Sequence, residues 1–207
     1  MVCYTVDSKR NAGTKKQQIT GGRAWKRHIY FWQMDLRRSR GLTVVDILRR
    51  AGVEIQMVSI MGRKELTGSH GIPVVADAVF EEVDFSDGTL FVLPGGMPGT
   101  KRLAAHGGLA AFLKEKNAEG KRLAAICAAP SVLGGLGLLE GRRAACYPGF
   151  EEALTGAEVS FDPVVVCGNV TTSRGMGTAI PFALALTEQL AGKEKADALA
   201  KGIIYAV

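Results

Sequence analysis

The stretch Lys121-Arg-Leu-Ala-Ala-Ile-Cys-Ala-Ala-Pro130 decides the fold class. Its first part, 122–126, is a short apolar run typical of a buried strand, and it leads directly into Cys127. Ala125 and Ala129 lie two positions to either side of the cysteine. This is the pattern of a nucleophile elbow, in which larger side chains would clash across a strained turn. The stretch therefore predicts a strand–turn–helix unit that carries a reactive thiol.

The rest of the chain from residue 41 alternates short apolar strands with helices. The expected strands are 53–60, 72–75, 89–93, 122–126, 143–146, 159–161 and 164–172, and the expected helices are 42–50, 100–116, 130–139, 178–190 and 194–205. This alternation predicts an α/β domain with a mostly parallel sheet covered on both faces. Chemistry in such sheets gathers at the carboxyl ends of the strands, where Pro94-Gly95-Gly96 and Cys127 are expected.

The position of Cys127 favours its reactive form. A sulfur at a helix N-terminus meets unpaired N–H groups and the positive end of the helix dipole, which favour the thiolate. The Ala128 N–H would then point at a developing oxyanion, and Gly96 could supply a second N–H. The alternative is that Cys127 is only a small buried apolar residue.

The composition of the 207 residues is that of a globular protein, with 47% apolar and 22% charged residues. The sequence contains no apolar run that would span a bilayer and no secretory signal, so we expect a cytoplasmic protein without membrane contact. The four cysteines lack metal-ligand spacing. We therefore expect reduced thiols, no metal and no cofactor.

The positive charge is confined to one segment. Residues 1–40 carry ten Lys or Arg and two acidic residues, whereas the remainder has 16 basic and 18 acidic residues. A nucleic-acid-binding role for the whole protein therefore has no support. We name residues 1–40 the basic leader and expect the α/β domain to cover 41–207.

Three stretches carry a family resemblance: Val92-Leu-Pro-Gly-Gly-Met-Pro-Gly99, Ala124-Ala-Ile-Cys-Ala-Ala-Pro130 and Thr172-Ser-Arg-Gly-Met-Gly-Thr178. They resemble the signatures of the ThiJ/PfpI superfamily, most closely its DJ-one branch. The resemblance implies a flavodoxin-like three-layer sandwich related to class I glutamine amidotransferases, a homodimer, and Cys127 as nucleophile and oxidation-sensitive thiol. It also implies glyoxalase, deglycase or redox-regulated chaperone activity, and it places Gly95, Tyr147 and Arg174 near the site.

The sequence departs from the family pattern at two positions. The family's acid/base glutamate, which follows a first apolar strand, would fall at position 40, where this chain has Arg40. Arginine favours a thiolate but does not exchange protons near neutral pH. Tyr147 stands where many members have a histidine, and the three histidines, His28, His70 and His106, are expected to be solvated rather than catalytic.

The genetic code offers an explanation for the basic leader. The codons for Phe31-Trp-Gln-Met-Asp35 give Leu-Ala-(Asp or Asn)-Gly when they are read from the third base of the Phe31 codon. In the same shifted frame, the codons for residues 36–40 can encode Phe-Glu-Glu-Ile-Glu. That is the end of an apolar strand followed by the missing glutamate turn. Our hypothesis is an out-of-frame or misassigned leader. The rivals are a basic transit peptide and a nucleic-acid attachment segment.

Three functions remain open at this level. The first is a cysteine-dependent enzyme that acts on small aldehydes or glycated protein adducts, impaired in this chain because no proton carrier adjoins Cys127. The second is a redox sensor or chaperone in which Cys127 is oxidised without turnover. The third is an inert product of a damaged reading frame.

Overall fold

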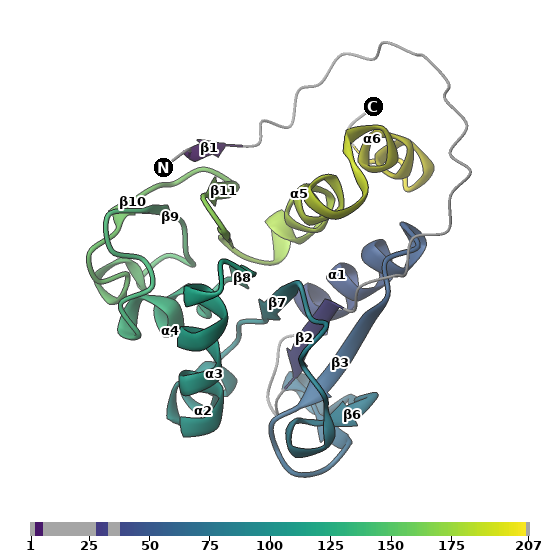
Figure 1. Ribbon diagram of the computed structural model, residues 1–207. Helices are drawn as coiled ribbons and strands as arrows, with labels where there is room; N and C mark the ends of the chain where they lie inside the picture. The colour runs from purple at the N-terminus through teal and green to yellow at the C-terminus, as the bar shows by residue number, and fades with distance from the viewer. Residues whose placement is uncertain (1–2, 6–27, 33–37, 206–207) are drawn as a thin grey trace.

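The computed structural model describes residues 3–5, 28–32 and 38–205, and one eight-stranded sheet forms its centre (Figure 1). The strand order is β1-β11-β12-β8-β7-β2-β3-β6. Neighbours from β12 to β6 are parallel, whereas β11 is antiparallel to β12 and to β1. The strands are β1 (Cys3–Thr5), β2 (His28–Trp32), β3 (Ile55–Ser59), β6 (Ala78–Val79), β7 (Leu90–Leu93), β8 (Arg122–Ile126), β11 (Val164–Cys167) and β12 (Val170–Ser173). The sheet is mostly parallel, as predicted.

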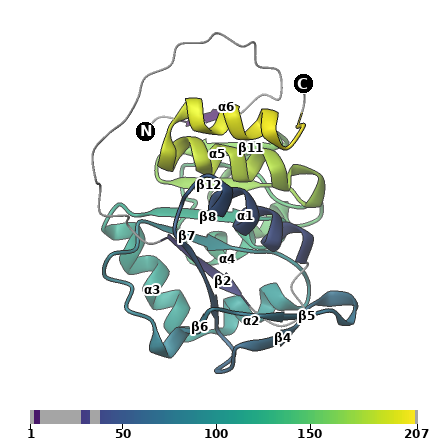
Figure 2. The same ribbon diagram turned by 90° about the vertical axis from the view of Figure 1, so that its right-hand side faces the viewer.

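Helices cover both faces of this sheet, and Figure 2 shows the same layers from the side. The helices are α1 (Arg38–Arg50), α2 (Gly99–Ala105), α3 (Gly107–Ala118), α4 (Pro130–Gly135), α5 (Ala179–Ala191) and α6 (Lys193–Gly202). α5 packs against α1 and α6 on one face, and α2, α3 and α4 lie on the other. The architecture is therefore the predicted three-layer sandwich. No helix in the described part of the chain is long and apolar enough to cross a membrane.

Short elements complete the fold. Two separate pairs of strands are β4 (Glu65–Thr67) with β5 (Pro73–Val75), and β9 (Arg143–Ala144) with β10 (Glu158–Val159). Four 3₁₀ turns cover Ser69–Gly71, Phe80–Glu82, Glu151–Ala153 and Met176–Thr178.

The strand β8 shows why these residues form a central strand. Successive side chains of a strand point to opposite faces. Ala124 and Ile126 join the core under α1 and α5, whereas Leu123 and Ala125 join the core under α2, α3 and α4. A strand that is buried on both faces needs apolar residues throughout, which is why β8 has no polar alternation.

The strand β2 lies within the basic leader and occupies a central position. It pairs in parallel with β3 on one side and β7 on the other. The sheet therefore includes residues 28–32, which lie before the expected start of the α/β domain at residue 41. α1 then begins at Arg38. Whether residues 1–40 arise from a shifted reading frame stays a prediction, because strand pairing does not report on the coding frame.

Several predicted elements differ in extent, and the helix expected over 194–205 ends at Gly202. The helix expected over 100–116 is two helices, because His106 has an extended backbone and caps α3, its Nδ1 accepting a 3.0 Å hydrogen bond from the Leu109 N–H. The helix expected over 130–139 ends at Gly135, and Gly137 has φ 75°, which α-helix does not permit.

The prediction of a single strand over 164–172 is wrong. It is an antiparallel hairpin of β11 and β12 that turns at Gly168 and Asn169. Gly168 has φ 61°, the left-handed conformation that glycine adopts without steric strain. The turn places Ser173, at the end of β12, beside the end of β8.

Candidate functional site

The turn after β8 has the strained geometry of a nucleophile elbow. Cys127 has φ 67°, a left-handed conformation that non-glycine residues rarely adopt. Hydrogen bonds hold its main chain on both sides. The Cys127 N–H donates to the Ser173 carbonyl oxygen at 2.9 Å, and its own carbonyl oxygen accepts from the Tyr147 N–H at 2.8 Å. The structure therefore supports the strained backbone through neighbouring segments.

Gly95 lies so close to the elbow that no side chain fits there. A Cβ at Gly95 would be 2.3 Å from the Ile126 carbonyl oxygen, 2.7 Å from the Cys127 Cβ and 2.8 Å from the Ala128 nitrogen. All three distances are shorter than van der Waals contact. The sequence therefore has glycine here because the loop after β7 rests directly on the turn after β8.

Two backbone N–H groups lie beside the contact between Gly95 and the elbow, and they have no hydrogen-bond acceptor among the described residues. Within the described residues, neither the Gly96 N–H nor the Ala128 N–H donates a hydrogen bond. The Gly96 carbonyl oxygen is used, since it accepts from the Thr100 N–H at 2.8 Å and from the Thr100 hydroxyl at 3.1 Å. Buried N–H groups are rarely left unpaired, so these two are available for a negatively charged oxygen.

The thiols of Cys127 and Cys146 are both buried. Cys127 is 4% exposed and Cys146 is 3% exposed. Burial and the charge of Glu151 raise the pKa of the Cys146 thiol to about 11, so it stays protonated at neutral pH. What separates Cys127 from Cys146 is its backbone position at the elbow, beside unpaired N–H groups.

The sequence predicted reduced thiols at all four cysteines, and the structure differs from this prediction. Cys127 and Cys146 are free, whereas Cys167 is disulfide-bonded. Cys167 lies on β11, where Cys3 of β1 is its antiparallel register partner. The prediction of reduced thiols is therefore wrong for Cys167. No group of three or more metal-ligating side chains occurs within the described ranges.

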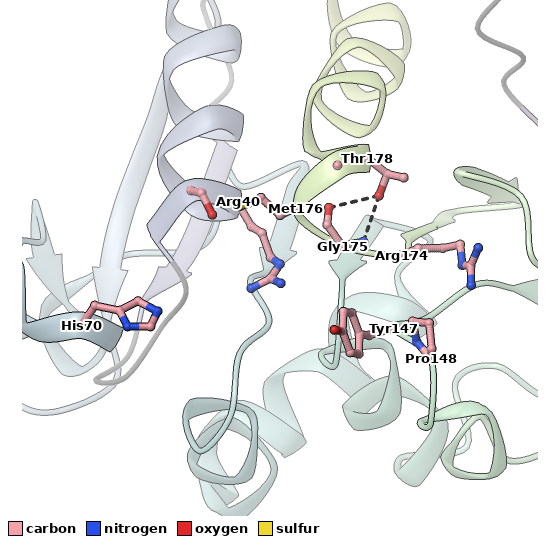
Figure 3. A pocket seen from close by; sticks show the side chains of 10 residues that line it. Arg40, His70, Tyr147, Pro148, Arg174, Gly175, Met176 and Thr178 are labelled. Atoms are coloured by element: carbon pink, nitrogen blue, oxygen red, sulfur yellow. Dashed lines mark hydrogen bonds between the residues drawn. The ribbon is translucent and has the colours of Figure 1, made fainter.

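A cavity of about 650 Å³ lies beside the elbow. Figure 3 shows side chains that line it, which come from the start of α1, the loop before β5, the segment after β9 and the segment after β12. Six of them are Ser39, Arg40, His70, Tyr147, Arg174 and Thr178. The cavity thus brings together Arg40, Tyr147 and Arg174 from distant parts of the sequence. Cys127, Gly95, Gly96 and Ala128 are not among the residues that line it.

Arg40 is the most unusual of these residues. Its side chain is 5% exposed, and neither Nε nor Nη1 has a hydrogen-bond partner. Figure 3 shows the guanidinium extending from the first turn of α1 into the space between His70 and Tyr147. An unpaired buried charge is costly, so Arg40 sits where an opposite charge would be stabilised.

Tyr147 and Arg174 differ in how they face the cavity. Tyr147 is 45% exposed, and its ring packs against Gly175, where a Cβ would lie 3.3 Å from the Tyr147 Cδ2. The Arg174 guanidinium lies 5.6 Å from the Phe161 ring centroid and donates to the Phe161 carbonyl oxygen at 3.3 Å. It therefore points away from Arg40 (Figure 3).

A hydroxyl pair fixes the wall formed after β12. The Thr178 hydroxyl oxygen accepts from the Gly175 N–H at 2.9 Å and lies 2.7 Å from the Ser173 hydroxyl. The Ser173 hydroxyl also donates to the Pro163 carbonyl oxygen at 2.7 Å. The third signature stretch therefore supports the same Ser173 main chain that holds Cys127.

His70 also lines the cavity, although the sequence predicted a solvated histidine there. It is exposed, as expected, but it lines the cavity on the side of the β4–β5 pair. It has φ 70°, so the turn presents it in a left-handed conformation. No local pattern could have found it, because only the tertiary fold brings residue 70 near residues 40 and 147.

Comparison with known proteins agrees with this geometry. The model of the DJ-1/PfpI family matches residues 35–189. Protein DJ-1 homolog B and homolog A of Arabidopsis thaliana are 39% and 41% identical over 75% of the chain, which spans 36% and 41% of their own lengths. Glutathione-independent glyoxalase DJR-1.2 of Caenorhabditis elegans is 31% identical over 78% of the chain and 86% of that protein.

A solved structure shares this architecture over most of the chain. The oxidized DJ-1 of Toxoplasma gondii superposes with a TM-score of 0.83 at 35% identity, covering 87% of this chain and 99% of that one. The family match, the relatives and the fold agree over the region that contains the elbow. The chain therefore belongs to the DJ-1/PfpI family.

Proposed function

We propose that the chain is a cysteine-dependent enzyme that acts on small reactive carbonyl compounds or their protein adducts, of the glyoxalase or deglycase type, with turnover limited by proton transfer. The observation that carries this proposal is Cys127 at a left-handed turn, directly beneath Gly95 and beside two unpaired N–H groups. One relative in the family is named a glutathione-independent glyoxalase.

The first chemical step follows from this arrangement. The Cys127 thiolate adds to an aldehyde carbon, a carbon–sulfur bond forms, and the carbonyl π electrons move to oxygen. The N–H groups of Gly96 and Ala128 stabilise the resulting oxyanion, which then takes a proton to give a hemithioacetal. α4 is only six residues long, so these local N–H groups contribute more than a helix dipole.

The second step needs a proton carrier. For methylglyoxal, a proton must leave the former aldehyde carbon and another must reach its neighbour, which gives a thioester that water cleaves to lactate. Arg40 stands at the position of the family's glutamate, and a guanidinium is not a proton carrier in proteins. The phenol hydroxyl of Tyr147 donates and accepts hydrogen bonds but is a poor general base. We therefore propose slow turnover.

The second candidate function is a redox sensor or chaperone in which Cys127 is oxidised. The burial of Cys127 favours it, because a thiol at 4% exposure meets small oxidants more readily than larger substrates. The two unpaired N–H groups would hold the oxygens of a sulfinate as well as an oxyanion. The resemblance also suggests a homodimer and a cytoplasmic location, which remain proposals.

Methylglyoxal consumption separates the two functions. The enzyme proposal expects lactate formation that Cys127→Ser abolishes and Cys146→Ser leaves unchanged, because Cys146 is a buried, protonated thiol. The sensor proposal expects no lactate from any variant, together with peroxide-dependent mass gain on Cys127 alone.

A further inference from the structure

We propose that the cavity beside the elbow binds a small monocarboxylate, held by the guanidinium of Arg40. This site lies in a different group of residues from Cys127 and its N–H donors, and it does not depend on Cys127 reactivity. It assigns a ligand to a residue that the proposed reaction cannot use as a proton carrier.

The unpaired guanidinium is the first observation. Arg40 is only 5% exposed, yet its Nε and Nη1 have no hydrogen-bond partner. A guanidinium offers five N–H donors in one plane, which match carboxylate oxygens well. A buried cation without a partner is strongly unfavourable, so a bound anion would remove that penalty.

The surroundings of Arg40 are the second observation. Among the described residues that line the cavity, none is acidic, whereas Ser39, Tyr147 and Thr178 bring hydroxyl groups. Arg40 also lies in the first turn of the thirteen-residue helix α1, which has no acidic residue in that turn. The positive end of a helix dipole adds to the attraction for a negative charge.

Charge and size together select the ligand class. Among the described lining residues, Arg40 supplies the one fully buried charge, because Arg174, whose Nε is also unpaired, is only partly buried and donates through Nη1 to the Phe161 carbonyl oxygen. A monoanion neutralises that single charge, whereas a dianion such as hydrogen phosphate would leave one negative charge desolvated. A volume of about 650 Å³ is in the range of small-molecule sites, so a carboxylate with a short organic remainder fits.

Isothermal titration of the full chain with sodium lactate, at fixed ionic strength in a buffer free of carboxylates and phosphate, tests the site. Wild-type protein should bind lactate, and Arg40→Gln should bind at least about tenfold more weakly, because a charge-assisted hydrogen-bonded pair is lost. Arg40→Lys should lie between them. The control Arg122→Gln, which changes an exposed arginine on β8, should bind as wild type does.

Thermal unfolding gives a second readout that does not depend on measurable heats. Without lactate, Arg40→Gln should unfold at a higher temperature than wild type, since an unpaired buried charge is removed. Lactate should raise the unfolding temperature of wild type and leave that of Arg40→Gln unchanged. Equal stabilisation of both proteins, or no lactate binding by wild type, would overturn the proposal, and tighter binding of inorganic phosphate would overturn the monoanion assignment.

The same titration on Cys127→Ser separates this site from the proposed enzyme. Lactate should bind Cys127→Ser as tightly as wild type. If lactate binds but no variant turns over methylglyoxal, the enzyme proposal fails and the anion site stands. If wild type turns over methylglyoxal but binds no lactate, the anion site fails and the enzyme proposal stands.

Discussion

The main chains of Cys127 and Tyr147 are joined by a 2.8 Å hydrogen bond, in which the Tyr147 N–H donates to the Cys127 carbonyl oxygen. Tyr147 also lines the cavity that Arg40 enters, so the elbow and the cavity share one backbone segment. On its other side, Cys127 donates to Ser173, whose hydroxyl lies 2.7 Å from that of Thr178 on the cavity wall. The elbow is thus held between two cavity-lining segments.

The first prediction concerns thiol reactivity. Cys127 should react with iodoacetamide at pH 7.5 much faster than Cys146, because only the thiolate is a nucleophile and the Cys146 pKa is raised to about 11. Raising the pH should increase Cys146 labelling roughly tenfold per pH unit until that pKa is approached. Mass spectrometry after a brief reaction measures both sites, and Cys167 stays unlabelled without reductant because it is disulfide-bonded. Equal labelling of Cys127 and Cys146 at pH 7.5 would contradict the elbow interpretation.

The second prediction concerns the close approach of Gly95. Gly95→Ala places a Cβ 2.3 Å from the Ile126 carbonyl oxygen, and moving this backbone atom away costs conformational energy. We expect a loss of about 1–3 kcal/mol in the free energy of unfolding, with slower alkylation of Cys127. Gly107→Ala is the matched control, since its Cβ would meet nothing within 4 Å. Urea unfolding compares the two, and equal stability of both variants would refute the close contact.

The third prediction concerns the hydroxyl pair. Thr178→Val keeps the shape of the side chain but leaves the Gly175 N–H without its 2.9 Å acceptor. We expect a loss of about 1–3 kcal/mol in the free energy of unfolding. Thr67→Val, at an exposed position on β4, serves as the control. Chemical denaturation in which both variants match wild type would show that this network contributes nothing to stability.

Local sequence signals predicted the fold and the elbow well. The strand Arg122–Ile126 was predictable because an apolar run ends in a cysteine flanked by alanines, and the whole feature spans ten residues. The hairpin divides the predicted strand at Gly168-Asn169, and a Gly-Asn pair between two β-prone runs is itself a hairpin signal. The break at His106 depends on a side-chain cap, which hydrophobic periodicity does not report.

The cavity could not be predicted in the same way. Its wall combines residues near positions 40, 70, 147 and 175, which only the three-layer packing brings together. The burial of Cys127 has the same origin, since the loop at Gly95 covers the turn from another strand. The sequence did identify Arg40 as out of place, but only through the family resemblance, and its missing hydrogen-bond partners required the structure.

The reading-frame hypothesis for the basic leader makes a fourth prediction. A gene with the surplus base near the Arg40 codon removed should encode an apolar strand and a glutamate turn joined to Gly41. We expect that product to unfold at a higher temperature than the chain as given, because it replaces an unpaired buried arginine. A lower unfolding temperature for the repaired product would contradict the hypothesis. Resequencing the gene across that codon tests it independently.

The central claim is that Cys127 is a nucleophile whose turnover is limited by Arg40 in place of a proton-exchanging residue. The most direct measurement is the rate of methylglyoxal consumption by the chain as given, by Arg40→Glu and by the frame-repaired product, each with and without Cys127→Ser. General acid–base assistance is typically worth about 10²–10⁴-fold in rate. We predict slow, Cys127-dependent turnover by the chain as given, and turnover at least about 10²-fold faster in both versions that carry glutamate. A chain with Arg40 that already matches those versions, or turnover that survives Cys127→Ser, would contradict the account.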